Sequence, residues 1–508
     1  GFRILKDTKK YDKSRQLHKE DYLYENRVEL KANIEVPSIS SMYKEGRNDV
    51  NEYGSDLLER ILSKDNMNNA YKRVKANKGS HGIDGMTVDE LLQYLKEHGQ
   101  KLRQSLLEGR YKPQPVRRVE IPKPDGGKRL LGIPTVVDRV VQQAIAQILI
   151  PIYEGKFINN NYGFRPLRSA KQAVEKCRQY INAEYTWAVD IDLAKYFDTI
   201  NHDKLIRLLS NDIKDGRVIS LIRKYLKSGV MINGVVMGTG EGAPQGGPLS
   251  PLLSNIMLHE LDVELTKRKL CFCRYADDCN IYVKSKKAAN RVMESITKFI
   301  EEKLKLKVNK DKSTVDRPWK LKFLGFSFYR GKGEYRIRTH EKSLNKFKAK
   351  LKKLTSRSNA MNIEYRFLKL KQAIVGWINY FAIADMRNIL RTLDKWLRRR
   401  IRMCFWKQWK KIKTKHDNLV KLGIPNNKAW EYASTRKGYW RISSSPILSK
   451  ALTNKYLKEI GLISISEMSF ISTLISIEPP CTERYARWCE RSLNKIIIQL
   501  LLDLKCII

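Results

Sequence analysis

Two short strand-like segments of this chain carry aspartates within largely apolar sequence. The segment at 186–193 contains Asp192, and the segment at 272–283 contains Asp277 and Asp278. A carboxylate in such a strand is costly unless something neutralises it. If the two strands lie side by side, their acids repel one another unless a cation lies between them. We therefore expect a fold that pairs these strands around a cation.

Magnesium matches this arrangement of carboxylates. It takes oxygen ligands, keeps some of its waters, and often binds through one or two carboxylates together with substrate phosphates. Two such ions, roughly 3.5–4 Å apart, activate an attacking hydroxyl and stabilise a leaving pyrophosphate. The alternative is that each acidic pair is an exposed turn, which is the commoner meaning of an isolated Asp-Asp. Tyr275 on one side of the pair and the apolar run 281–283 on the other favour the metal site.

The pattern of strands and helices divides the chain into four parts. Between 115 and 335, short strands alternate with helical stretches, and the clearest strands are 116–122, 186–193 and 272–283. This mixture is typical of an α+β fold rather than a doubly wound one. After about residue 340 the strand signals stop, and apolar residues recur at helical spacing. We therefore predict a polar N-terminal arm, an α+β domain, a helical domain and a C-terminal tail, at 1–50, 51–335, 336–465 and 466–508.

The charge of the chain indicates a polyanionic partner. The sequence has 98 lysines and arginines against 54 acidic residues, a formal net charge of +44. Such an excess repels itself unless a partner cancels it, and nucleic acid does so with release of counterions. An anionic membrane surface is the second choice. No apolar run approaches the ~18 residues of a spanning helix, so we expect no membrane insertion. The eight cysteines form no CxxC pair, and we expect reduced thiols in a cytoplasmic protein.

The tetrapeptide YADD at 275–278 resembles the catalytic signature of reverse transcriptases. Four more segments resemble motifs of that family and occur in the family's order. They are IPKPDGGKRLLGIP (121–134), DLAKYFD (192–198), GAPQGGPLSPLLSN (242–255) and LKFLGF (321–326). The resemblance implies a right-hand polymerase fold, in which fingers and an antiparallel palm sheet flanked by helices precede an α-helical thumb or maturase domain.

The resemblance also implies roles for the acidic residues. Asp192 and Asp277 correspond to ligands that bridge two Mg²⁺ ions, and Asp278 corresponds to a third carboxylate. Asp192 is preferred over its neighbour Asp190 because Phe197 lies five residues beyond it, where the family places the side chain that reads the sugar of the nucleotide. We expect Asp190 to be structural, and Asp198 likewise.

Further residues correspond to the family's binding site for the incoming dNTP. Lys123 and Arg129 flank a Pro-Asp-Gly-Gly turn and would clamp the triphosphate, although without the resemblance they form only a basic hairpin. Gln245 would hydrogen-bond near the nucleotide, although a PQGG sequence alone is a plain turn. Lys312 resembles the lysine that protonates departing pyrophosphate, and by composition it is one lysine among many.

Two segments upstream of the YADD sequence resemble the group II intron class of reverse transcriptases. IDGMTVDEL (83–91) resembles an extra N-terminal motif of that class, and NNNYGFRPLRSAKQAV (159–174) is the second segment that resembles the class. In the latter, Arg165, Arg168 and Lys171 are candidates for contacts with a nucleic-acid backbone. The alternative is an ordinary helix start with solvated basic residues.

The segment after the strands resembles the thumb or maturase domain of the same class. Its parts are GWINYFAIADM (376–386) and RTLDKWLRRRIRMCFWKQWKK (391–411), and Trp396 to Lys415 holds nine lysines and arginines, four aromatics and no acid. We expect most of the aromatics to be core and the cations to bind RNA. The candidates are Arg398, Arg399, Arg400, Arg402, Lys407, Lys410 and Lys411.

Taken together, these patterns predict an RNA-directed DNA polymerase of a mobile group II intron. We expect it to bind its intron RNA, an RNA template and a DNA primer or target, in a bacterial cytoplasm near the nucleoid, with no obligatory protein partner. Two alternatives are a splicing-only maturase and a reverse transcriptase recruited to defence or diversity generation. The complete set of carboxylates and nucleotide-binding residues favours the polymerase. No H-N-H endonuclease pattern occurs in 466–508, and we assign no chemistry to that segment.

Overall fold

The computed structural model describes residues 56–122, 127–232, 235–238, 240–242 and 246–470. The chain divides into two compact units, one ending at Ile337 and the other beginning at Arg338. The sequence placed this division between residues 335 and 336. Among the described residues, no helix is both long enough and apolar enough to cross a membrane.

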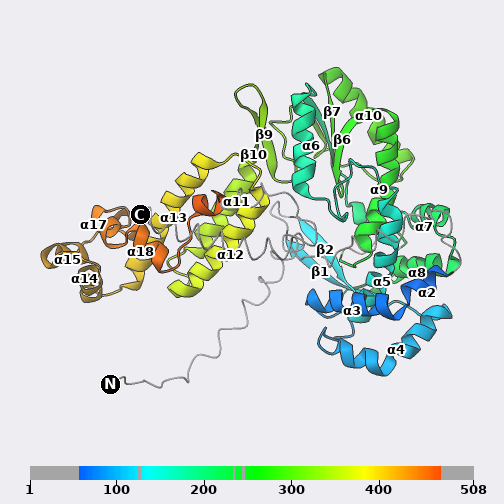
Figure 1. The fold of residues 1–508 in the computed structure, drawn as a ribbon, viewed down its shortest axis with the longest axis horizontal. Helices are drawn as coiled ribbons and strands as arrows, with labels where there is room; N and C mark the ends of the chain where they lie inside the picture. Colours follow the sequence, from blue (N-terminus) through cyan, green and yellow to red (C-terminus); the bar gives the residue numbers. More distant parts are fainter. Residues whose placement is uncertain (1–55, 123–126, 233–234, 239, 243–245, 471–508) are drawn as a thin grey trace, which may run out of the picture. The chain divides into compact units, whose positions relative to one another are not determined.

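The first unit contains a four-stranded antiparallel sheet that carries the acidic segments (Figure 1). Its strands, in the order β6-β7-β3-β8, are β6 (Cys271–Tyr275), β7 (Asp278–Val283), β3 (Trp187–Ile191) and β8 (Thr314–Asp316). Three helices pack on these strands: α6 (Ala170–Asn182) and α9 (Ser250–Lys267) contact β6, while α10 (Lys286–Glu302) contacts β3, β7 and β8. The predicted α+β character, with an antiparallel sheet flanked by helices, is therefore present.

One strand prediction is wrong, and the error falls at the acidic pair. The segment 272–283 is not a single strand, because Tyr275 pairs with Asp278 across a two-residue turn of Ala276 and Asp277. Ala276 has a left-handed φ of +56°. That conformation normally calls for Gly or Asn and costs other residues roughly 1–2 kcal/mol. The sequence has neither Gly nor Asn at this left-handed position, so the hairpin could not be predicted from it.

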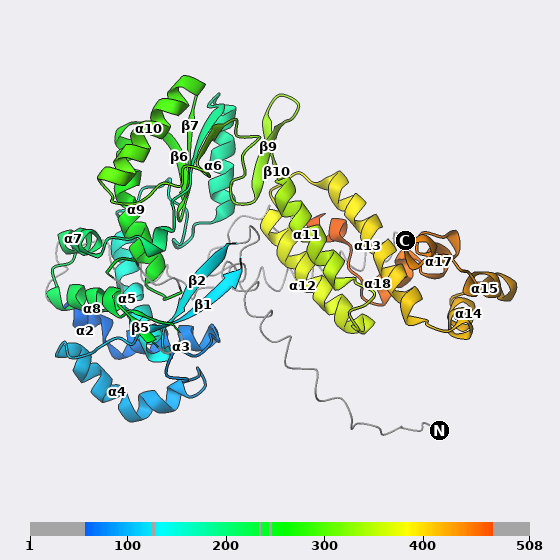
Figure 2. The same ribbon diagram turned by 180° about the vertical axis from the view of Figure 1, so that it is seen from behind.

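A second sheet of the first unit has the order β2-β1-β4-β5. β1 (Val116–Pro122), which lies where the sequence predicts it, pairs antiparallel with β2 (Lys128–Ile133) and parallel with β4 (Val230–Ile232). β5 (Val235–Met237) completes the sheet beside β4. Figure 2 shows β1 and β2 as one hairpin. The remaining elements of this unit are α2 (Leu57–Ile61), α3 (Lys64–Ala76), α4 (Leu91–Leu107), α5 (Val136–Glu154), α7 (His202–Asp212), α8 (Gly216–Lys227), the 3₁₀ turn η2 (Tyr196–Asp198) and β9 (Phe326–Arg330). β10 (Tyr335–Thr339), which pairs with β9, runs across the boundary between the units.

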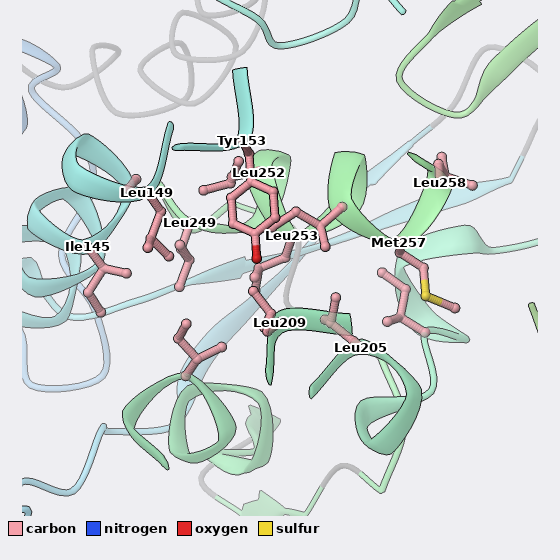
Figure 3. Close-up of a cluster of buried hydrophobic side chains, with 14 of the residues drawn as sticks. Ile145, Leu149, Tyr153, Leu205, Leu209, Leu249, Leu252, Leu253, Met257 and Leu258 are labelled. Atoms are coloured by element: carbon pink, nitrogen blue, oxygen red, sulfur yellow. The ribbon is translucent and has the colours of Figure 1, made fainter. Parts of the chain in front are cut away.

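The core of the first unit forms around α5, α7 and α9. Side chains of the three helices meet in Figure 3, where those labelled are Ile145, Leu149, Tyr153, Leu205, Leu209, Leu249, Leu252, Leu253, Met257 and Leu258. Residues 252–258 of α9 are all buried, which is typical of a helix segment covered on all sides. Among its buried polar side chains, Asn255 and Asp262 need partners inside the protein.

The second unit is helical throughout its described residues after Thr339, as the apolar spacing predicts. Phe347 and Trp377 stack with ring centroids 4.3 Å apart, and Phe381 packs beside Trp377. Trp406 and Trp409 are also buried, so these aromatics belong to the core. The helices are α11 (Glu341–Leu354), α12 (Ile363–Phe381), α13 (Arg387–Gln408), α14 (Ile412–Lys421), α15 (Asn426–Ala433), α16 (Tyr439–Ile442), α17 (Pro446–Ala451) and α18 (Asn454–Glu459).

Candidate active site

The pairing of β3 with β7 brings the two acidic segments together. Ile191 is paired with Cys279, so the next residues in the same register, Asp192 and Asp278, are opposite one another at the end of the ladder. Opposed Cα atoms in antiparallel strands lie about 4.5–5.5 Å apart. Asp277 is in the adjoining turn, half-buried like Asp192, while Asp278 is exposed. The strands thus meet at the aspartates, as the sequence predicts.

Asp190 belongs to the same acidic group, although we expected it to be structural. Burial, followed by the charges of Asp278 and Asp192, raises the pKa of Asp190 from 3.8 to about 7. Its position two residues before Asp192 on a strand puts both side chains on one face. That alternation was visible in the sequence and was the signal for a fourth carboxylate.

The loop at 309–313 holds the end of β3. The backbone N–H of Asp192 donates to Ser313 Oγ (3.1 Å), and its carbonyl accepts from the backbone N–H of Asn309 (2.8 Å). Lys312 lies in this loop with its side chain exposed, and its backbone N–H donates to the Asn309 carbonyl (3.3 Å). The loop that carries Lys312 therefore contacts the backbone of Asp192.

The donor chemistry of this group fits a hard divalent cation. Asp190, Asp192 and Asp278 offer oxygen ligands alone, which suits Mg²⁺ better than zinc. The rise in the pKa of Asp190 shows that these carboxylates share one electrostatic neighbourhood, which a cation would relieve. In the part of the chain that the structure describes, however, no three His, Cys, Asp or Glu side chains are already gathered as a ligand set. Mg²⁺ tolerates this, because waters and substrate phosphates complete its shell.

Tyr196 and Phe197 lie in different environments. The segment is not extended, because Tyr196–Asp198 forms a 3₁₀ turn after Lys195, whose φ is +47°. Tyr196 is 2% exposed and its hydroxyl donates to the Ser254 carbonyl (2.9 Å), whereas Phe197 is half-buried against the core. Burial raises the pKa of Tyr196, and the charge of Asp277 adds to the rise, so this ring lies within electrostatic reach of Asp277.

Arg165 must be withdrawn from the predicted nucleic-acid contacts. It is 7% exposed, and its guanidinium forms an ion pair with Glu154 (2.7 Å) and donates to the carbonyls of Ile158 (2.7 Å) and Asn161 (2.9 Å). These bonds connect Arg165 to residues 154–161 of its own segment, so its guanidinium stabilises the local fold. Arg168 donates to Asn159 Oδ1 (2.8 Å) and remains half-exposed, and burial lowers the pKa of the half-buried Lys171.

Several predicted nucleotide contacts cannot be placed. Lys123 and Gln245 lie outside the described residues, and of Arg129 only the backbone, within β2, is described.

Three of the four clustered arginines of α13 are held inside the second unit. Arg399 donates to the Trp440 carbonyl (2.9 Å) and its guanidinium lies 3.9 Å from the Trp440 ring centre. Arg400 donates to Thr355 Oγ1 (2.5 Å), and Arg402 donates to the Leu452 carbonyl (3.1 Å). Lys407 lies over the ring of Tyr439, and Arg398 is half-buried. The exposed cations of the predicted set are Lys410 and Lys411.

Comparison with known proteins assigns both halves of the chain. Residues 121–328 match reverse transcriptase (RNA-dependent DNA polymerase), and residues 344–423 match the group II intron maturase-specific domain. Protein YkfC of Escherichia coli is 35% identical over 299 residues, which are 51% of this chain and 78% of YkfC. The chain belongs to the group II intron reverse transcriptase/maturase family. The matched RNA-directed DNA polymerase domain contains the carboxylate site, and the maturase domain contains α13.

Other similarities cover less of the compared protein. The group II intron-encoded protein LtrA of Lactococcus lactis is 39% identical over 232 residues, which are 46% of this chain and 38% of LtrA. A solved structure titled partial Cas6-RT-Cas1–Cas2 complex shares 21% identity, with a TM-score of 0.32 and coverage of 48% of this chain and 42% of that chain. That TM-score is too low for any conclusion.

The pKa of Asp190 generates a prediction about stability. Because the folded-state pKa of Asp190 is about 7 and its ordinary value is 3.8, the folded protein binds more protons between these pH values than the unfolded chain. Stability should therefore fall as pH rises through this window, by roughly 4 kcal/mol at most. Urea unfolding in EDTA at pH 4.5 and 7.5 measures it. In Asp190→Asn the side chain cannot ionise, so the variant should lose this part of the pH dependence of the free energy of unfolding. If the free energy of unfolding changes with pH equally in the wild type and the variant, the prediction is wrong.

Proposed function

We propose that this chain is the polymerase of a mobile group II intron, which copies RNA into DNA and binds its intron RNA to assist splicing and retrohoming. The observation that carries the proposal is the register that sets Asp192 opposite Asp278, with Asp277 in the adjoining turn. The family match and the net charge of +44 support a nucleic-acid substrate. The intact acidic group argues against a splicing-only maturase.

In this proposal Asp192 and Asp277 bind two Mg²⁺ ions, and Asp278 is the third carboxylate. When bound, the ions lower the pKa of the primer 3′-hydroxyl and stabilise the charge on departing pyrophosphate. The side chains hold their positions through the strand ends and the turn, so little reorganisation is needed during the reaction. Lys312, on the loop bonded to Asp192, would supply a proton to the leaving group.

In the proposal the dNTP is bound by residues of three further motifs. Lys123 and Arg129 bind the triphosphate and Gln245 lies beside the nucleotide. Phe197 packs under the sugar. It is the half-buried member of the aromatic pair, whereas Tyr196 is occupied with the Ser254 carbonyl. This arrangement completes a right-hand polymerase with fingers, palm and thumb.

RNA binding is proposed for the exposed Lys410 and Lys411 and for four further cations of the predicted set that are half-exposed. Arg168 and Lys171 belong to the first unit, and Arg398, Lys407, Lys410 and Lys411 belong to the second. The internally bonded Arg399, Arg400 and Arg402 would act through the fold of the maturase domain instead. A bacterial cytoplasm near the nucleoid is part of the same proposal.

Replacing Asp277 with Asn tests the polymerase directly. The change removes a metal-binding charge and keeps the size of the side chain, so primer extension on an RNA template should fall at least about a hundredfold, roughly 3 kcal/mol or more in activation free energy. Binding of structured RNA, measured by filter retention, should change less than about threefold. Extension above a few percent of wild type would remove Asp277 from the metal site.

The aromatic pair generates a prediction about sugar selection. Phe197→Ala should increase incorporation of ribonucleotides relative to deoxynucleotides by about ten- to hundredfold, because a large ring no longer excludes the 2′-hydroxyl. Tyr196→Ala should instead lower the unfolding midpoint, since it opens a cavity and removes the hydrogen bond to the Ser254 carbonyl. Single-nucleotide incorporation with matched rNTP and dNTP measures the selection. If only Tyr196→Ala relaxes the selection against ribonucleotides, Phe197 is not the residue that reads the sugar. The assignment of Asp192, which depends on its spacing from Phe197, is then wrong as well.

The exposed cations predict a change in salt dependence. Lys410→Ala combined with Lys411→Ala should weaken binding to structured RNA and reduce the log–log salt slope by up to about 2, since each phosphate contact contributes roughly 0.7–0.9. The matched control is Lys96→Ala with Lys101→Ala, two exposed lysines on α4. Equal slopes for both double variants would show that Lys410 and Lys411 only face solvent.

A further inference from the structure

Directly behind the acidic turn lies a buried arginine. Arg274, the residue before Tyr275, donates from Nε and Nη2 to the two carboxylate oxygens of Asp262 on α9 (2.6 and 2.5 Å). Both side chains are 0% exposed. Removing two charges from water costs several kcal/mol each, and only close bidentate geometry with further hydrogen bonds offsets that cost. Because its cost and its gain nearly cancel, such an ion pair adds little to the stability of the fold. It indicates more strongly that the two side chains hold other groups in position.

The remaining guanidinium nitrogen shows what that task is. Nη1 of Arg274 donates to the carbonyl of Ala276 (2.8 Å) and to Asn255 Oδ1 (3.1 Å). Ala276 is the left-handed residue immediately before Asp277. Arg274 therefore connects α9 to the peptide group between Ala276 and Asp277. The orientation of that peptide sets the direction of the acidic turn.

A second contact fixes the turn from the neighbouring loop. The backbone at Asn160–Tyr162 pairs with Arg274: the Tyr162 N–H donates to the Arg274 carbonyl (2.8 Å), and the Arg274 N–H donates to the Asn160 carbonyl (2.9 Å). Gly163 then passes so close that a Cβ there would lie 2.1 Å from the Ala276 nitrogen. Only a residue without a Cβ allows this approach.

Asn255 joins the two contacts into one network. Its Nδ2 donates to the Gly163 carbonyl (2.7 Å), while its Oδ1 accepts from Arg274 and from Asn161 Nδ2 (3.2 Å). Asn161 Oδ1 in turn accepts from the Gly163 N–H (3.2 Å). Three segments, the 160–163 loop, α9 and β6, thus meet behind Ala276, and the loop is distant in sequence from the other two.

We propose that Arg274, Asp262 and Gly163 are positioning residues for Asp277: the ion pair holds the Ala276 carbonyl, and Gly163 sets the depth of the turn. The inference rests on the proposed polymerase activity. These contacts also explain the strained backbone of Ala276, since a left-handed alanine persists only where its surroundings impose that conformation. None of the three residues touches substrate in this account, and each acts through the backbone of the turn.

The test uses the full chain with Arg274→Lys, Asp262→Asn and Gly163→Ala. Lysine keeps the charge and cannot donate to Asp262, Asn255 and Ala276 together, whereas Gly163→Ala displaces the turn and leaves the ion pair in place. Controls are Asp215→Asn, another buried aspartate paired with an arginine, and Gly99→Ala, where a Cβ meets nothing within 4 Å. Thermal unfolding shows that each variant is folded.

Two measurements separate positioning from plain stability. In primer extension, the three variants should lose about ten- to hundredfold in kcat with the dNTP KM and the primer–template Kd within about threefold, as expected for a misplacement near 1 Å. Binding of Mn²⁺ followed by electron paramagnetic resonance should weaken about five- to tenfold in the same variants. Neither quantity should change in the controls, even where the unfolding midpoint falls.

The outcomes decide the proposal in each case. Folded variants with wild-type kcat and Mn²⁺ affinity overturn it, and so do controls that lose as much as the variants. If Arg274→Lys and Asp262→Asn fail to fold, Gly163→Ala alone decides. If the wild type extends no primer, the proposed function fails, while the Mn²⁺ measurement still tests whether the network positions Asp277.

Discussion

The buried ion pair between Arg274 and Asp262 is the interaction on which the acidic site depends. A charge pair with no solvent contact must be satisfied completely, and here the guanidinium does so by reaching the turn carbonyl and Asn255 as well as the carboxylate. The same bonds connect the central helix α9 to the strand that ends at the aspartates. The buried apolar residues of α9 hold this helix in the core, and its buried Asn255 and Asp262 bind the arginine that contacts the turn.

The basic residues of the chain fall into two groups, those that form bonds inside the protein and those that face solvent. Arginines such as Arg165 and Arg366 are buried and donate to carboxylates or backbone carbonyls, because a planar group with five N–H donors can join several loops at once. Lysines such as Lys410 and Lys411 remain exposed, since an ammonium group is strongly hydrated. A count of basic residues therefore overstates the number available to RNA, most clearly in α13, where three adjacent arginines brace the maturase domain.

The acidic residues show how much of the candidate site could be predicted from the sequence. Asp192, Asp277 and Asp278 could be identified from two apolar segments and their resemblance to one family, and β3 and β7 bring those segments together. Asp190 could also have been included, because alternation along a strand puts it on the face of Asp192. Its proton affinity could not be predicted, since the rise in its pKa comes from burial and from a charge 88 positions away in the sequence, that of Asp278.

By itself, the sequence determined the class of fold, the family, and the change from mixed structure to helices near residue 340, and it supplied the residues to which the proposed chemistry is assigned. These follow from local spacing and from motifs that are short and contiguous. Only the tertiary structure decided that 272–283 is a hairpin, that Arg165 is internal, and that Arg274 and Gly163 support the turn. The reason is physical: the left-handed Ala276 has no local preference for its conformation, so contacts from distant segments impose it.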